Sequence, residues 1–169
     1  MLREPDNAVG AEAGTMTDGW GAVRQATAQV MLADGILVEG RLHLLCRPSA
    51  HRVFESPLEM LNREAPFFAL TRPAGGVLFV AKAQAAVVSC PHEEPLDTLE
   101  RLPAAKLVAL DVVVTGGRGL RGWAPAELPP GRARSLDYVN GPGAFFALWT
   151  DDLAHCINKS LVRTIRPLD

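Results

Sequence analysis

The sequence is poor in aromatic residues and cysteine, and it has no strong excess of charge of either sign. Its 169 residues include one Tyr, three Trp and three Cys, and the net charge is −2 at pH 7. A chain this close to neutrality has no general field that attracts nucleic acid or an anionic membrane. No apolar run approaches the roughly 18 residues that a membrane-spanning helix needs. We therefore expect neither a membrane span nor nucleic acid as the main partner.

Cysteine usage and the first residues bear on the compartment. Cys46, Cys90 and Cys156 are odd in number and widely separated, which is typical of a reducing environment rather than of a disulfide framework. The first six residues lack the basic and apolar regions of a secretory signal. We therefore expect a cytoplasmic location. Met1 and Met16 are both compatible with a translation start.

A repeated motif is the strongest positive signal in the chain. Leu58–Asn62 is followed by Phe67–Leu70, and the pattern returns as Leu136–Asn140 followed by Phe145–Leu148, with identical internal spacing. Further along, Phe79–Lys82 aligns with Cys156–Lys159. Recurrence of this kind indicates two copies of one supersecondary unit. The main aligned structural positions are Gly35, Gly40, Asn62, Phe67 and Phe68 in the first copy and Gly117, Gly122, Asn140, Phe145 and Phe146 in the second.

Each copy is predicted to consist of short strands, tight turns and one short helix. Asp34-Gly35 between two apolar runs predicts a hairpin. Gly40 inside the return strand predicts a bulge or tight bend. Ser56-Pro57 predicts the start of a helix, since Ser is a favoured cap and Pro a favoured first residue. The apolar residues of the repeated motif are expected to be buried, and Asn62 and Asn140 are interpreted as helix caps.

These patterns predict a mainly β protein. We expect two tandem small β-barrel repeats of about 60 residues, each with one short helix, packed as a pseudo-symmetric pair. The predicted boundaries are a flexible tail over residues 1–25, a first repeat over 26–90, a helical connector over 91–106 and a second repeat over 107–169. A short strand is also expected over residues 51–54.

A glycine-rich stretch resembles a dinucleotide-binding motif. Gly117, Gly119 and Gly122 match G-x-G-x-x-G directly after an apolar strand. Pyrophosphate binding requires that such a turn open a helix, whereas Pro125 and a second cluster of prolines follow closely. The repeat instead assigns Gly117 and Gly122 to a hairpin turn and a strand. Flavin or dinucleotide binding through Gly117–Gly122 therefore remains the weaker alternative.

Other chemistry has little support in the sequence. Cys90, His92, His155 and Cys156 are the only Cys/His clusters, and together they would resemble a zinc-ligand set. His155 and Cys156 are neighbours in a predicted strand, so their side chains are expected on opposite faces. Whether the four residues converge stays open. No local signature of nucleophilic catalysis occurs, so we predict no catalytic residue, no metal site and no cofactor.

The repeated pattern resembles Sm-like and SH3-like small barrels. Val30–Gly40 and Val77–Val88 carry this resemblance, and Val112–Gly122 and Cys156–Ile165 repeat it. The chain is also similar to short bacterial domains of unknown function that combine Leu-x-x-Leu-Asn, a Phe-x-x-Leu strand and a Val-Asn-Lys end. Bacterial Sm-like RNA chaperones place His after the Lys of this last strand, but neither repeat does so here.

The leading functional hypothesis is a non-enzymatic protein-binding or assembly-accessory module. The partner would be another protein or complex that the sequence does not identify. The alternative is an Sm-like nucleic-acid or nucleotide binder. In either case the candidate interaction residues are Arg41, Lys82, Arg121 and Lys159, of which the two lysines occupy aligned positions.

Overall fold

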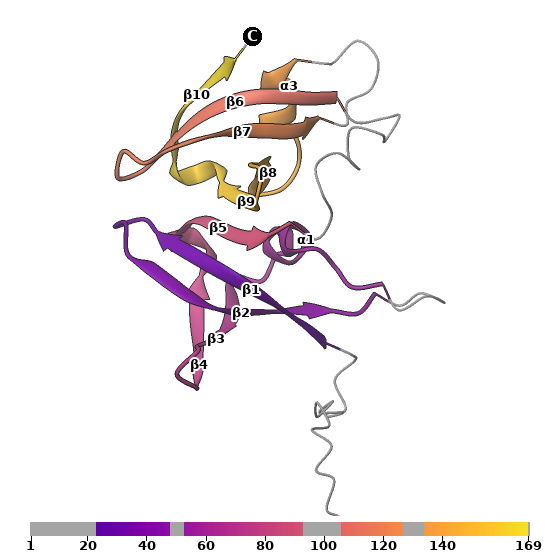
Figure 1. Cartoon of the computed structure of the whole chain (residues 1–169), viewed down its shortest axis with the longest axis vertical. Coiled ribbons are helices and arrows are strands. Elements are labelled where there is room, and N and C mark those ends of the chain that lie inside the picture. The colour runs from indigo at the N-terminus through magenta and orange to yellow at the C-terminus, as the bar shows by residue number, and fades with distance from the viewer. Residues whose placement is uncertain (1–22, 48–52, 93–105, 127–133, 169) are drawn as a thin grey trace, which may run out of the picture.

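The computed structural model describes residues 23–47, 53–92, 106–126 and 134–168. In these residues the fold is mainly β, with ten antiparallel strands in one sheet and two short α-helices (Figure 1). Neither helix of the described chain has the length and apolar character needed to cross a membrane.

The same order of elements occurs in both halves of the chain. The first half contains β1 (Val23–Leu32), β2 (Leu37–Leu45), α1 (Pro57–Asn62), β3 (Phe67–Thr71), β4 (Val77–Ala81), the 3-10 turn η1 (Lys82–Gln84) and β5 (Ala85–Pro91). The second half contains β6 (Lys106–Val114), β7 (Gly119–Ala126), α3 (Ser135–Val139), β8 (Phe145–Trp149), β9 (Leu153–Asn158), the 3-10 turn η2 (Lys159–Leu161) and β10 (Val162–Leu168).

The sheet is open, with the strand order β10-β6-β7-β8-β9-β5-β1-β2-β3-β4. Each half contributes five adjacent strands, and the pairing of β9 with β5 joins them. The two edge strands, β4 and β10, lie at opposite ends of the molecule (Figure 1). The prediction of two closed barrels is therefore not realised in the strand pairing, because β5 pairs with β9 of the other half and not with β4.

Two predicted boundaries differ from the structure. Strand β1 begins at Val23, so the predicted tail extends too far, and Val23 pairs with Leu45 in the ladder to β2. The strand predicted over residues 51–54 is, among the described residues, only a bridge between Cys46 and Phe54. The predicted connector helix lies outside the described residues, between the end of β5 and the start of β6.

Glycines set the turns and the close strand crossings. Gly35 and Gly117 have φ of +88° and +79°, in the left-handed region that tight turns require, and the predicted β1–β2 hairpin is confirmed. A Cβ at Gly40 would lie 2.6 Å from the Thr71 carbonyl oxygen. The β1–β2 register runs through Gly40 without a shift, so this glycine allows close approach of β3 rather than forming a bulge. The glycine-rich stretch continues as β7, a strand and not the helix that pyrophosphate binding needs.

The described residues form two hydrophobic clusters, and each contains residues from both halves. The first cluster includes Val30, Leu42, Leu44, Met60, Leu61, Phe68 and Leu70, together with Phe145 and Cys156 from the second half. The second cluster includes Leu110, Val112, Val114, Phe146, Leu148 and Ile157, together with Met31, Ala86 and Val87 from the first half. This exchange of core residues makes the two halves one packing unit.

Candidate interaction surface at the edge of the sheet

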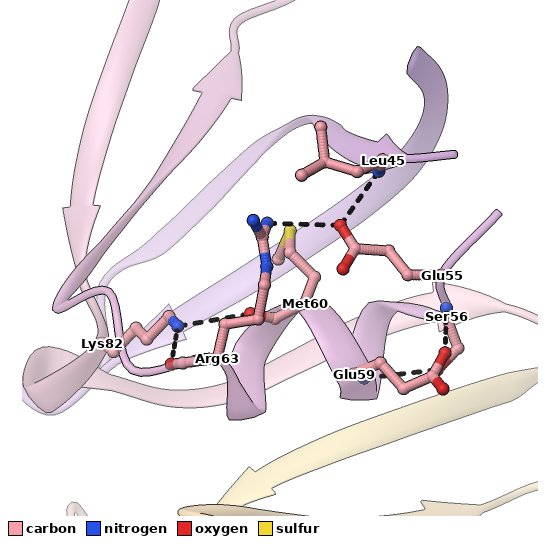
Figure 2. A network of polar contacts seen from close by, with 7 residues as sticks. All are labelled: Leu45, Glu55, Ser56, Glu59, Met60, Arg63 and Lys82. Atoms are coloured by element: carbon pink, nitrogen blue, oxygen red, sulfur yellow. Dashed lines mark hydrogen bonds and ion pairs between the residues drawn. The ribbon is translucent and has the colours of Figure 1, made fainter. Parts of the chain in front are cut away.

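The start of α1 is fixed by a reciprocal pair of hydrogen bonds. The Ser56 hydroxyl accepts from the Glu59 backbone N–H (3.2 Å), and the Glu59 carboxylate accepts from the Ser56 backbone N–H (2.7 Å; Figure 2). Pro57 occupies the first turn, where its missing N–H costs no helical bond. This capping box confirms the helix start predicted from the sequence.

The end of α1 is held by a buried lysine. The Lys82 ammonium donates to the Met60 carbonyl (3.2 Å) and the Arg63 carbonyl (2.6 Å), as Figure 2 shows. Buried Glu55 accepts from the Leu45 N–H (2.9 Å) and lies 3.2 Å from the Arg63 guanidinium. Burial and then the Arg63 charge lower the pKa of Lys82, while Glu55 acts in the opposite direction. This network fixes α1 against β2 and η1.

With both of its ends fixed, α1 presents Asn62 to the second half of the chain. The Asn62 amide donates to the Phe145 carbonyl (3.2 Å) and accepts from the Phe145 N–H (2.8 Å). A Cβ at Gly143 would lie 2.7 Å from the Asn62 Cγ, so glycine is required beside this contact. The C-cap of α1 is Arg63. The interpretation of Asn62 as a helix cap is therefore wrong, and its amide instead acts as a one-residue strand partner for β8.

The β9–β5 seam adds a second contact between the halves. Cys156 lies opposite Val88 in the ladder. Buried Asn158 donates to the carbonyls of Lys82 (2.9 Å) and Ala85 (3.0 Å). The backbone ladder and this buried amide, together with Asn62, hold the two halves in one orientation.

The Cys/His residues do not share one face of this seam. Cys90 and Cys156 face the first hydrophobic cluster, and burial raises the pKa of the Cys156 thiol well above its usual range. His155 faces the opposite side, 2.8 Å from the Ser89 hydroxyl. Among the described residues, no group of three or more His, Cys, Asp or Glu side chains is placed to hold a metal ion.

Burial controls the charge of His155. Desolvation lowers its pKa to about 4, with further lowering by His92 and Arg118. The imidazole is therefore neutral near pH 7, as its buried site beside Ser89 requires.

The predicted interaction lysines have structural contacts. The Lys159 ammonium donates to the Gly141 carbonyl (2.5 Å) in the loop after α3, as Lys82 does after α1, and burial lowers the pKa of Lys159. Arg121 lies 3.4 Å from Asp111. Arg41 is exposed on β2 and forms no ion pair with another described residue. The structure does not bring these four side chains together at one site.

The β3–β4 hairpin carries an exposed apolar surface. Its outer side presents Phe67, Val77 and Phe79, which we call the hairpin face. Phe79 is 73% exposed, whereas the aligned Cys156, on β9 beside β5, is 4% exposed and lies in the first hydrophobic cluster. Phe67 is 57% exposed, whereas the aligned Phe145 is 2% exposed beneath α1. The expectation that Phe67 is a core residue is therefore wrong, because nothing among the described residues takes the place that α1 has over Phe145.

The backbone of β4 is also open. Hydrogen bonds at Arg72–Gly76 and Lys82–Pro66 fix the alternation of the β3–β4 ladder. This alternation turns the N–H and C=O groups of Val77, Phe79 and Ala81 away from β3, toward the free edge. Within the described part of the chain, this edge strand thus has backbone groups without partners as well as exposed apolar side chains.

The chain was compared with protein families, with curated proteins and with solved structures. No protein-family model, no curated protein and no solved structure matches the chain. The geometry of the hairpin face and of β4 therefore carries the functional argument.

Proposed function

We propose that the chain is a non-enzymatic protein-binding module that receives a partner strand along β4. The observation that carries the proposal is Phe79, a large apolar side chain that is 73% exposed on a strand whose outer edge has no partner among the described residues. Strand addition to such an edge combines main-chain hydrogen bonds with side-chain contacts.

The lack of protection on β4 supports this proposal. Soluble proteins usually guard a free edge with charged residues or proline. The opposite edge strand, β10, carries Arg163, Arg166 and Pro167. By contrast, β4 reads Val-Leu-Phe-Val-Ala, with no charge and no proline. An unguarded edge of this kind marks a surface that is covered in use.

The second half of the chain supports the proposal by analogy. If the halves are two small-barrel copies of one unit, as the aligned motifs indicate, then β9 is the counterpart of β4. β9 already has a strand partner in β5 and a helix, α1, packed beside it. In the second half this strand is thus already paired with a strand of the other half. In the first half the aligned strand β4 has no such partner among the described residues.

The contribution of Phe79 sets the expected effect of a substitution. Full burial of a Phe side chain is worth about 1.5–3 kcal/mol. We therefore expect Phe79→Arg to weaken partner binding by about tenfold to a hundredfold. Because Phe79 is largely exposed, the substitution should leave the fold intact.

The test uses wild-type and Phe79→Arg chains as paired baits in a lysate of the native host. The proposal predicts a stoichiometric protein that the wild-type chain retains and the variant loses. Arg118→Ala, a change of an exposed side chain in the turn between β6 and β7, should retain it. Recovery of the same proteins with Phe79→Arg, or no stoichiometric protein in either case, would refute the proposal.

A further inference from the structure

The β9–β5 seam between the two halves predicts how two copies of the chain can bind each other. In that seam β9 pairs with β5, and α1 packs on β8 and β9. The aligned surfaces that stay open are β4 with the hairpin face in the first half, and β10 with α3 in the second half. We propose that a second copy of this chain binds head to tail, with its β4 and hairpin face against β10 and α3 of the first copy.

This inference rests on the proposed function, because it names the partner of the same edge. The two surfaces lie at opposite ends of the molecule (Figure 1), so one chain can use both at once. Such a head-to-tail contact joins two different surfaces, and it continues to add copies until the assembly closes on itself.

The strongest support comes from Asn140 and Phe67, the aligned counterparts of Asn62 and Phe145, which are not hydrogen-bonded to each other within the described chain. Asn62 binds both backbone groups of Phe145. Its counterpart Asn140 is the exposed C-cap of α3, as the sequence predicted, and caps through its backbone N–H. The Asn140 side chain has no hydrogen-bond partner among the described residues. The counterpart of Phe145 is Phe67, whose N–H and C=O point away from β4, because the Phe67–Ala81 pair is not a hydrogen-bonded one.

Strand β2 does not reach these groups of Phe67, since it pairs with β3 only at Leu70 and Thr71. An Asn140 amide from a neighbouring copy would therefore meet an N–H and a C=O with the spacing that Asn62 already uses inside the chain. The repeated asparagine thereby gains a role that helix capping does not supply.

The exposed side of α3 supplies an apolar counterpart to the hairpin face. None of the residues of α3 is buried. Leu136 is 64% exposed, whereas the aligned Leu58 packs against the first hydrophobic cluster, which includes Phe145. Phe67 of a second copy would cover Leu136 as Phe145 covers Leu58.

The register of the β5–β9 ladder predicts the register of the proposed ladder between β10 of one copy and β4 of the next. Val88 lies opposite Cys156 inside the chain. Transfer to the aligned positions places Ile165 of one copy opposite Phe79 of the next. Ile165 already packs against the second hydrophobic cluster, so β10 is held in place for pairing.

Three differences make the external contact weaker than the seam, and two of them are residues that guard the edge of β10. Pro167 aligns with Cys90, whose backbone N–H faces β9 in the alternation of the ladder, and proline has no N–H. Arg163 stands where Ala86 is buried. Ala81 stands where Asn158 makes two bonds across the seam. We therefore expect association that depends on protein concentration.

The test is the molecular mass of the purified full-length chain, measured from low concentration to the limit of solubility. Phe79→Arg disables the β4 surface, and the double variant Leu136→Glu/Asn140→Ala disables the α3 surface. Both sites are exposed, and circular dichroism checks that each variant folds. Wild type should exceed two copies, and each variant alone should stay monomeric. An equal mixture of the two variants should form a one-to-one pair, because each retains the surface that the other lacks.

The outcomes separate this inference from the proposed function. Asn140→Ala alone should weaken association by about tenfold, the effect of one to two hydrogen bonds. A wild-type chain that is monomeric at all concentrations refutes the second copy, and the bait experiment still decides protein binding. A dimer that stops at two copies and ignores the α3 variant also refutes it, since two β4 strands would then pair with each other. Association that Phe79→Arg leaves unchanged refutes a second copy at β4, and the bait experiment again decides the proposed function.

Discussion

The two aligned asparagines predict opposite effects of the same substitution. Asn62→Ala removes two hydrogen bonds, at 2.8 and 3.2 Å, and leaves the N–H and C=O of buried Phe145 without these partners. A lost hydrogen bond costs about 1 kcal/mol, and a stranded buried polar group costs about 1–3 kcal/mol. We therefore expect the free energy of unfolding to fall by about 2–3 kcal/mol.

The matched control is Asn140→Ala, since Asn140 has no side-chain hydrogen bond within the described residues. Its substitution should change stability by less than about 0.5 kcal/mol in dilute protein. Urea denaturation at low concentration measures both values, and the melting temperature of Asn62→Ala should fall by about 5–10 °C. Equal losses in the two variants, or no loss in Asn62→Ala, would refute the cross-half role of Asn62.

Three further predictions concern the glycines, His155 and Lys82. Gly122→Ala should destabilise the fold by at least about 1–3 kcal/mol, because its Cβ would lie 2.2 Å from the Trp149 carbonyl oxygen. The control Gly119→Ala places its Cβ in open space and should fold normally in the same urea assay. The pKa of His155, about 4 when folded and 6.5 as the ordinary value, means that the unfolded state binds more protons between these values. The stability that this group contributes is therefore present above about pH 6.5 and lost as the pH falls through 4. His155→Gln should make the free energy of unfolding depend less on pH in this range. Parallel curves of unfolding free energy against pH for the two proteins would contradict this prediction. Lys82→Met should cost about 1–3 kcal/mol by removing the bonds to the Met60 and Arg63 carbonyls, whereas Arg41→Met, on the exposed surface, should cost little in the same measurement.

Local features of the fold were predictable from the sequence. Asp34-Gly35 indicated a hairpin, and Ser56-Pro57 indicated a helix start, because turn and cap chemistry depends on residues close together in the chain. The spacing of the repeated motif predicted the same helix and strand in both halves, and both are present.

Contacts between distant residues were not predictable in the same way. The role of Asn62 depends on Phe145, 83 residues further along the chain. Burial of Phe67 was expected because Phe145 and Phe67 have the same local sequence, yet only Phe145 meets α1. Likewise, closure of the first barrel depended on whether β5, which pairs with β1, takes β4 or β9 as its second partner, and hydrophobic patterning does not specify this choice.

Backbone amide hydrogen exchange tests the central claim, that β4 is the binding edge, most directly. It compares the dilute wild-type chain with the same chain in complex or at high concentration, resolved at Val77, Phe79 and Ala81. The account predicts that these outward-facing amides exchange quickly in the dilute chain and slow on association, and that Phe79→Arg abolishes the slowing. Protection that appears elsewhere on the sheet while the β4 amides stay fast would contradict it.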